Sequence, residues 1–342
     1  MVSSKSGIPA ALVATGVILF AAYQAEAVLA PVTAGVFLMA VLWPAQNWLS
    51  QRIPALIALA ITIAATSAVV LAFASLIAWA FTRVGQSVIA DAARYQALYD
   101  SAVSWLDQRG VSIAHVWADT INMSRLIGLA HRVTSRLNTT LSFWLITLLY
   151  VVLGLMEVGV LRRKVETLVE PCRAVKLLSA TSHSAYKLRR YLGVRTLMSL
   201  TTGVLIGLFA WTVDLRFPVE WAVIAFTLNY IPFIGSFIAT LLPTLFEMAQ
   251  ANSWQSIVGI FVCLNIIQFV VGSYIEPRLA GAVLSVSPLL VLFATFFWSY
   301  MWGLYGAFIG VPITIVALTF CGHFESTRMI AEMLGGPLPK AR

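Results

Sequence analysis

Charged residues divide this chain into long apolar stretches. A transmembrane helix needs about 20 apolar residues to cross about 30 Å of hydrocarbon. Six runs without Asp, Glu, Lys or Arg are long enough or nearly so, and they cover 53–82, 137–156, 196–213, 221–246, 248–275 and 279–324. This pattern predicts an all-α, polytopic membrane protein.

The N-terminal stretch 8–43 is also apolar apart from a short polar tip around Glu26. It predicts two short helices, 8–23 and 28–43, joined as a hairpin, which brings the total to about eight transmembrane segments. A cleaved signal peptide is the alternative, because Lys5 precedes the apolar run and Ala25-Glu26-Ala27 imitates a cleavage site. Apolar residues resume directly after Glu26, which favours two membrane helices.

Composition and charge favour a membrane protein over a soluble one. Charged residues make up 11% of the chain and apolar residues 60%, whereas soluble domains carry about 25% charged residues. The composition therefore argues against a soluble enzyme. It also argues against nucleic-acid binding, because the basic residues lie between apolar runs rather than on one patch. The net charge of +8 is typical of a membrane protein with basic cytoplasmic loops.

The segment 162–195 sets the expected orientation. It contains nine Lys and Arg residues against Glu166 and Glu170, a local net charge of +7. Basic loops face the cytoplasm, so this segment is predicted to be cytoplasmic. Counting spans from it places both termini in the cytoplasm and the segment 83–136 outside.

The external segment is predicted to be helical. Apolar residues recur there at three-, four- and seven-residue spacing before Gly110, at Val88, Tyr95, Tyr99, Ala102 and Leu106. A second amphipathic stretch follows over 116–133. Such helices either pack on the membrane or on a neighbouring subunit, or they form a lid over a pathway.

These features divide the chain into six segments. They are the N-terminal transmembrane helices (1–82), the external amphipathic segment (83–137), a transmembrane helix (138–161), the basic cytoplasmic segment (162–195), the C-terminal transmembrane bundle (196–322) and a cytoplasmic tail (323–342).

Helices in the C-terminal bundle are too long to be straight. The runs 221–246 and 279–324 would rise about 39 Å and about 69 Å as single helices. Proline removes a backbone donor and clashes with the preceding turn, so breaks or re-entrant helices are expected near 229–236, near 285–288 and around 303–312. Pro277 is expected to stop a further helix between Glu276 and Arg278. The residues assigned to breaks or hinges are Pro232, Gly235, Ser236, Pro243, Pro277, Gly281, Pro288, Gly303, Gly306 and Pro312.

Discontinuous helices point to a secondary transporter. Broken backbone at membrane depth is tolerated where it is buried in protein or lines a water-filled cavity, and paired broken helices of this kind form solute and ion sites in transporters. The alternative is that these prolines merely bend helices around each other, because transmembrane helices are richer in Pro and Gly than soluble ones.

Five polar residues are candidates for the pathway or for ion coupling. Glu276 is a carboxylate at the edge of an apolar run, and Arg278 is close enough in sequence to pair with it; the alternative is that both anchor a helix end at the interface. Asn229, Asn265 and Gln268 are amides inside apolar runs that either bind a solute or cation or join neighbouring helices by hydrogen bonds.

No cofactor or metal is expected. The three Cys residues are widely spaced, the four His residues have no ligand spacing, and His-Glu-x-x-His does not occur. The chain is therefore not predicted to be an enzyme.

The last 115 residues resemble the autoinducer-2 exporter (AI-2E) family. The resemblance is carried by the segment from Leu228 to Ser236 (Leu-Asn-Tyr-Ile-Pro-Phe-Ile-Gly-Ser), by Glu276-Pro277-Arg278 followed by Gly281, and by Phe297-Trp298 with Gly303, Gly306 and Val311-Pro312. The order and spacing of these motifs agree with the family pattern, and the rest of the chain agrees in layout. Ser299, Tyr305 and Phe308 depart from it, which puts local packing there in question.

The resemblance implies a bacterial inner-membrane transporter, uncleaved at its first helix, that exports a small polar solute or signalling molecule such as autoinducer-2. The implied partners are the lipid bilayer, the solute, a proton or sodium ion, and further copies of the chain, with a pentamer among the assemblies allowed. Two alternatives stay open. A sodium/proton antiporter needs a deep carboxylate, for which Glu276 is the sole candidate, and a non-transporting oligomeric scaffold would have no need of broken helices.

Overall fold

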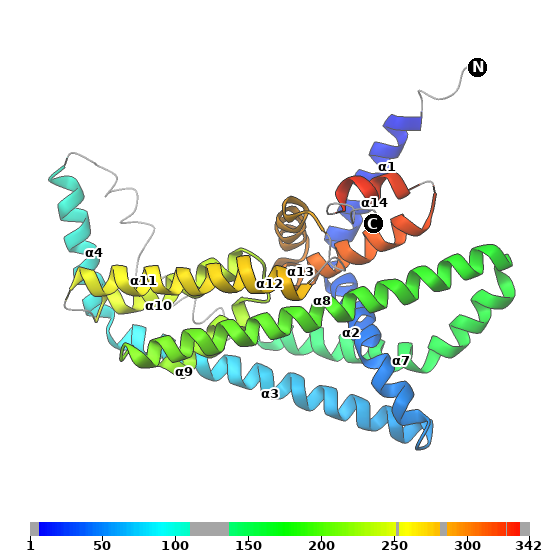
Figure 1. Ribbon diagram of the computed structural model, residues 1–342, viewed down its shortest axis with the longest axis horizontal. Coiled ribbons are helices and arrows are strands. Elements are labelled where there is room, and N and C mark those ends of the chain that lie inside the picture. The colour runs from blue at the N-terminus through cyan, green and yellow to red at the C-terminus, as the bar shows by residue number, and fades with distance from the viewer. Residues whose placement is uncertain (1–6, 110–136, 251–252, 281–285, 326, 336–342) are drawn as a thin grey trace. The chain divides into compact units, whose positions relative to one another are not determined.

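The computed structural model describes residues 7–109, 137–250, 253–280, 286–325 and 327–335. Its elements are helical, in the order α1 (Gly7–Gln24), α2 (Glu26–Ser50), α3 (Ala55–Ala90), α4 (Ala92–Asp107), α7 (Leu137–Leu168), α8 (Pro171–Thr212), α9 (Pro218–Leu228), α10 (Ile234–Met248), α11 (Trp254–Phe269), η1 (Val270–Ile275), α12 (Glu276–Ala280), α13 (Pro288–His323) and α14 (Arg328–Leu334) (Figure 1). No strand occurs in these ranges. Gly110, the stretch 116–133 and Gly281 lie outside them.

Six helices are long and apolar enough to cross a membrane. They lie within α2, α3, α7, α8, the continuous α11–η1–α12 and α13, and shorter apolar helices are present in α1, α9 and α10. Large apolar side chains such as Val69 and Leu71 on α3 are exposed, as expected for contact with lipid. The prediction of an all-α, polytopic membrane protein is confirmed.

The chain forms two compact units. The first comprises Met1–Thr66, Ser142–Gly193 and Ala280–Arg342, and the second comprises Ser67–Leu141 and Val194–Leu279. The boundaries fall inside α3, α7, α8 and α12, so these helices contribute to both units.

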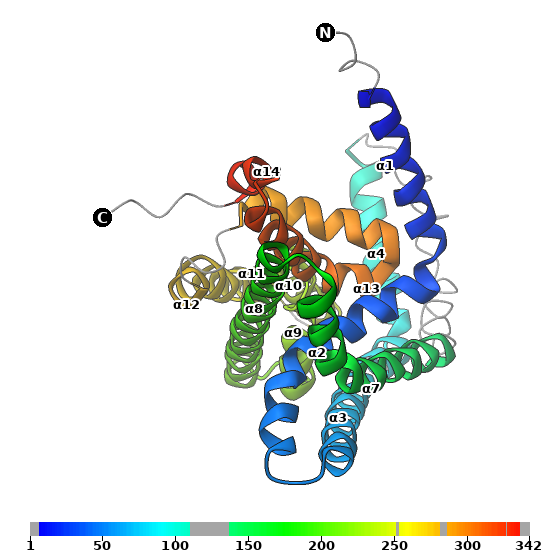
Figure 2. The ribbon, with the colours of Figure 1, turned by 90° about the vertical axis from the view of Figure 1, so that its right-hand side faces the viewer.

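In the first unit, the predicted N-terminal hairpin is wrong. A single residue, Ala25, separates α1 from α2, and its φ of −91° and ψ of 19° bend the chain without turning it back (Figure 2). The N–H of Ala25 still bonds to Ala21 and that of Leu29 to Ala25. Helix–helix reversals usually take two or more linking residues, so one residue yields a bend.

Glycines let α2 and α7 approach closely in the first unit. A Cβ on Gly35 would lie 3.0 Å from the Cβ of Tyr150, and a Cβ on Gly154 would lie 2.6 Å from the Sδ of Met39. Small residues at such positions are typical of helix packing in membranes.

The helix α13 is a folded-back hairpin rather than one rod. Trp302 and Gly303 have non-helical backbone, with φ of +56° at Gly303. A Cβ on Gly306 would overlap the carbonyl oxygen of Trp298, and one on Gly310 would lie 3.0 Å from that of Ala294. The two halves therefore pack against each other on either side of the turn, which is the break predicted around 303.

Two other prolines of this region act differently from one another. Pro288 occupies the first turn of α13, a position where its missing N–H is harmless. Pro312 lies inside the second half of α13 without interrupting it, so the predicted break does not extend to residue 312. Neighbouring helices and polar groups allow such prolines in membrane helices.

In the second unit, α9 and α10 form a re-entrant helical hairpin. The first helix starts after Phe217, which has left-handed backbone, and the second returns to the same end of the unit. This return is shown by Phe246, whose ring lies 5.4 Å from that of Trp221 and 5.8 Å from that of Phe217. The hairpin packs in a buried core that consists of Ala80, Val84, Ile206, Ala210, Leu215, Trp221, Ile224, Ala225, Ala239, Phe246, Ile260 and Leu264.

The tip of this hairpin, residues 229–233 between α9 and α10, lies within the break predicted near 229–236. Phe233 has positive φ, and a Cβ on Gly235 would overlap the carbonyl oxygen of Leu228. Only glycine fits there without moving the backbone. Pro243 does not contribute a break, because α10 continues through it and it is buried inside the helix.

A pair of glycines seats the hairpin on α8. A Cβ on Gly203 would lie 2.7 Å from the carbonyl oxygen of Ala222, and one on Gly207 would lie 2.8 Å from the Cβ of Ala222. Glycines four residues apart let two helix backbones approach closely. The position of the tip along α8 therefore depends on Gly203 and Gly207.

Pro277 does not stop its helix, contrary to the prediction. The helix α11 runs into a π-helical turn, η1, and continues as α12. In this turn the N–H of Glu276 bonds to the carbonyl of Val271, five residues back. The wider turn makes room for the proline ring that a regular α-helix would exclude.

Candidate functional site

A polar face of α8 meets the tip of the α9–α10 hairpin inside the second unit. Arg195, Ser199 and Thr202 are four and three residues apart, so they share one face of the helix, and all three are buried. The side chains considered as one polar cluster below are Arg195, Thr196, Ser199, Thr202, Asn229, Tyr230, Ser236 and Glu276.

Asn229 joins three segments of the cluster. Its side-chain amide donates to the hydroxyl of Ser199 at 3.4 Å, and its carbonyl oxygen accepts from the hydroxyl of Ser236 at 3.3 Å. Asn229 is only 4% exposed. A buried amide held in this way fixes the tip against both α8 and the start of α10.

Tyr230 adds a second link between the tip and α8. Its hydroxyl donates to the hydroxyl of Thr196 at 2.9 Å. The adjacent Ile231 is buried and gives the N–H that bonds to Leu228. The tip therefore presents polar side chains on one side and an apolar anchor on the other.

Glu276 pairs with Arg195 and not with Arg278. The Nη1 of Arg195 lies 2.9 Å from the Oε1 of Glu276, and the two side chains are 7% and 33% exposed. Residues two apart on a helix point to different sides, so Arg278 cannot reach the carboxylate. Its guanidinium lies instead over the ring of Tyr274, 5.5 Å from the ring centre.

Two buried polar atoms of the cluster have no hydrogen-bond partner among the described residues. They are the Nε of Arg195 and the hydroxyl oxygen of Thr202. Buried donors normally find a partner. These two groups, beside a broken helix, are therefore available to form hydrogen bonds with a solute or with water.

The other predicted amides lie apart from this cluster. Asn265 is exposed, and its amide donates to the carbonyl of Phe261 in its own helix at 2.8 Å. The amide nitrogen of Gln268 is buried with no partner in the described part of the chain. Neither forms a hydrogen bond to the polar cluster in that part.

Five of the eight members of the polar cluster are not among the candidates that the sequence provides. Arg195 lies in the segment predicted to be a basic cytoplasmic loop, and no sequence pattern above assigns Thr196, Ser199, Thr202 or Tyr230 to the site. The spacing of Arg195, Ser199 and Thr202 carries the signal, because one charged and two hydroxyl residues share a face where α8 becomes apolar. Of the predicted break residues, Pro232, Gly235 and Ser236 lie in the hairpin that carries the cluster, whereas Gly303 and Gly306 belong to the α13 hairpin of the first unit.

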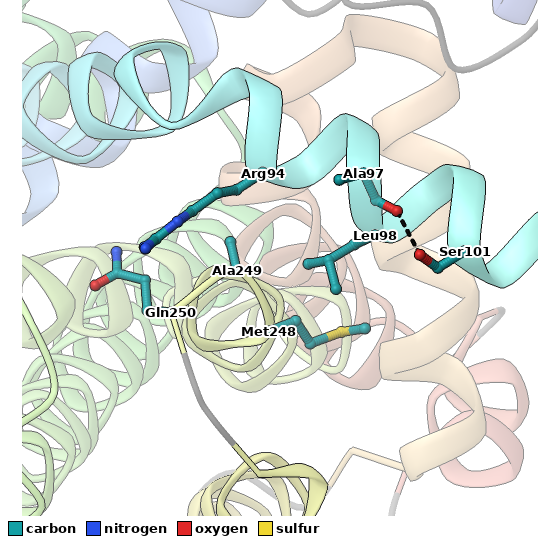
Figure 3. Close-up of a pocket in the computed structure, with 7 residues that line it drawn as sticks. All are labelled: Arg94, Ala97, Leu98, Ser101, Met248, Ala249 and Gln250. Carbon is teal, nitrogen blue, oxygen red and sulfur yellow. Dashed lines mark hydrogen bonds between the residues drawn. The ribbon is translucent and has the colours of Figure 1, made fainter.

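A second polar region lies where α4 meets the end of α10. Arg94, Leu98, Met248 and Gln250 line a cleft of about 290 Å³, with Leu98 facing Met248 and Arg94 extending toward Gln250 (Figure 3). Gln250 also accepts from Arg216 at 3.5 Å. These contacts hold the open end of the hairpin to α4.

Buried and paired polar groups surround the open end of the hairpin. Glu220 is buried and pairs with Arg83 at 2.9 Å, and Arg216 lies 3.5 Å from Asp91. The hydroxyl of Tyr95 donates to the carbonyl of Phe246 at 3.3 Å. Burial, with a smaller contribution from the Asp91 carboxylate, raises the pKa of Tyr95 to about 12.

No group of three or more His, Cys, Asp or Glu side chains is arranged to hold a metal ion within the described ranges. The polar cluster contains one carboxylate, which an arginine already engages. Its chemistry is that of hydrogen bonding and ion pairing rather than of metal ligation.

Comparison with known proteins agrees with the resemblance. Residues 12–326 match the family described as AI-2E family transporter. A putative transport protein of Borreliella burgdorferi is 30% identical over 190 residues, 55% of this chain and 52% of that protein. The AI-2 transport protein TqsA of Escherichia coli is 28% identical over 217 residues, 64% of this chain and 62% of TqsA. The putative transport protein YhhT of Escherichia coli is 31% identical over 161 residues, 47% of this chain and 46% of YhhT. The chain thus matches about half the length of these relatives.

Proposed function

Because the chain belongs to the AI-2E transporter family, we propose that it is a secondary transporter that exports a small polar solute, such as an autoinducer-2-like signalling molecule, across the bacterial inner membrane. In this proposal the polar cluster of the second unit contacts the solute. Coupling to a proton or sodium gradient supplies the driving force.

The polar cluster is the observation that carries the proposal. A hairpin that enters and leaves the unit at one end brings an amide, hydroxyls and an ion pair together among apolar helices. Polar side chains inside a membrane protein are costly unless they are paired or functional. The unpartnered Nε of Arg195 and hydroxyl of Thr202 favour a site that receives a ligand.

Transport by the full chain in liposomes tests the proposal. The solute is autoinducer-2, loaded inside or outside, and flux is measured under imposed proton and sodium gradients. We expect flux from wild type and at least a tenfold loss from Asn229→Leu, which removes the links to Ser199 and Ser236. The matched control is Asn265→Leu, an exposed amide that bonds only within its own helix in the described structure and should leave flux unchanged. Equal flux from Asn229→Leu and wild type would contradict the assigned site.

The sodium/proton antiporter interpretation is less well supported. Its carboxylate would be Glu276, where a proton and a sodium ion must compete. Arg195 already contributes a positive charge 2.9 Å from that carboxylate. This charge opposes sodium binding at the same place, so solute export is the better proposal.

The proposed orientation keeps the basic residues from Arg162 to Arg190 and the C-terminal tail in the cytoplasm, whereas Arg195 belongs to the buried cluster. Both ends of the α9–α10 hairpin then open to the outside. The predicted cytoplasmic N-terminus relied on a hairpin between α1 and α2, and the bend at Ala25 removes that support. Assembly into a homo-oligomer remains a proposal based on the family.

A further inference from the structure

We infer that Arg195 is an anion site, occupied by Glu276 in this structure and taken over by a carboxylate-bearing solute during transport. This inference rests on the proposed function and adds a second solute class, small carboxylates, beside the autoinducer-2-like solute proposed above.

The two partners differ in their access to solvent. The side chain of Arg195 is 7% exposed and is held on the buried face of α8, whereas Glu276 is 33% exposed and lies at the start of the short helix α12. Glu276 can therefore leave the pair and be hydrated. Arg195 cannot, because its helix face is packed inside the unit.

Arg195 also has an unused donor. Glu276 contacts it through one oxygen on Nη1, and the buried Nε has no partner among the described residues. A guanidinium presents its N–H groups as a planar fork that matches the two oxygens of a carboxylate. One oxygen from Glu276 satisfies this fork only in part, so a ligand with two acceptor oxygens would use it better.

A neutral solute would not replace Glu276. Removing one partner of a buried ion pair leaves an uncompensated charge, which is strongly unfavourable. A solute that displaces Glu276 must therefore bring its own negative charge to Arg195. Arg195 would exchange the carboxylate of Glu276 for that of the solute, so the net charge beside the guanidinium stays the same.

The surrounding groups favour a hydroxylated solute. Asn229 and Tyr230 contribute an amide and a hydroxyl to the cluster from the hairpin tip, and the Thr202 hydroxyl, about two turns along α8 from Arg195, has no partner in the described ranges. Amide and hydroxyl groups both donate and accept hydrogen bonds. The substrate class is therefore a small hydroxylated carboxylate.

The test uses the purified full chain in detergent and acetate as the probe. Glu276→Ala empties the place of the native carboxylate, and its thermal unfolding is measured in sodium acetate and in sodium chloride at equal ionic strength. We expect acetate to raise the midpoint by roughly 3 °C over chloride, as selective binding to the folded state would. Wild type should show a smaller difference, because Glu276 competes for the site.

Three further variants make the result specific. Arg195→Met combined with Glu276→Ala should show no acetate effect, and Glu332→Ala, which removes an exposed carboxylate paired with Arg328, should behave as wild type. Glu276→Gln keeps the shape of the side chain and repeats the test if the alanine variant does not fold. An acetate effect in both Glu276→Ala and the double variant, or in neither, would overturn the anion site.

The outcome is separable from that of the proposed function. Flux of autoinducer-2 without an acetate effect would overturn the carboxylate site and leave the transporter proposal intact. An acetate effect without flux would support the anion site while contradicting the proposed solute. If both hold, lactate and glycerate should inhibit flux, and glycerol, which has hydroxyls but no carboxylate, should not.

Discussion

The guanidinium of Arg195 and the carboxylate of Glu276 are 81 residues apart in sequence and 2.9 Å apart in space. They join the start of the apolar part of α8 to the end of the helix that begins at Trp254. Four expectations follow from this pair and from other contacts of the second unit.

Removing Arg195 should destabilise the protein. Arg195→Met leaves Glu276 without its partner, and because that carboxylate is one-third exposed we expect a loss of about 1–2 kcal/mol rather than the larger loss of a fully buried pair. Thermal unfolding in detergent measures the change. The double variant Arg195→Met, Glu276→Leu should recover part of the loss, and a double variant that is less stable than the sum of the single ones would contradict a direct pair.

A methyl group at the hairpin tip should abolish transport. In Gly235→Ala the added Cβ overlaps the carbonyl oxygen of Leu228, so the start of α10 must move away from the end of α9 and the tip must change shape. We expect at least a tenfold loss of flux in liposomes with normal membrane insertion. The control is Gly259→Ala in α11, where a Cβ meets no atom within 4 Å. Unchanged flux in both variants would show that the tip is not part of the pathway.

The contact between the α9–α10 hairpin and the glycines of α8 should not tolerate a larger side chain. Gly203→Ala places a Cβ 2.7 Å from the carbonyl oxygen of Ala222. Overpacking of this kind destabilises the folded state by about 1–3 kcal/mol. Amide hydrogen exchange in α9 should become faster. Gly193→Ala, on the same helix with no atom within 4 Å, provides the comparison and should leave exchange in α9 unchanged.

Tyr95 should titrate late in alkaline solution. Burial raises its pKa to about 12, above the value of about 10 for an exposed tyrosine. The neutral form therefore favours the folded state, a contribution that is complete below pH 10 and is lost as the pH rises through 12. The difference in tyrosinate absorbance between wild type and Tyr95→Phe isolates this group, and a midpoint near 10 would mean that the hydroxyl is not buried.

Sequence patterns located the strongest backbone features correctly. The break predicted near 229–236 combines Pro232 with Gly235, and a regular helix would not allow the close approach of Gly235 to the carbonyl of Leu228. The turn at Gly303 likewise uses a conformation that other residues rarely adopt. Such features depend on the backbone conformation of a few adjacent residues, so the sequence alone can predict them.

Features that depend on the surrounding helix or on residues distant in sequence cannot be predicted in the same way. Pro277 alone predicts a stop, but a π-turn before it absorbs the ring. Pro243 and Pro312 sit inside helices whose surroundings support them. Arg195 belongs by sequence to a basic loop, and only the fold brings Glu276 to it.

The return of α10 to the end where α9 begins has a practical consequence for topology mapping. Twenty-six uncharged residues lie between Glu220 and Glu247, yet a reporter fused after Met248 should report the same side of the bilayer as one fused before Pro218. A hydropathy count that treats this run as a full crossing would invert the assigned side of every later segment.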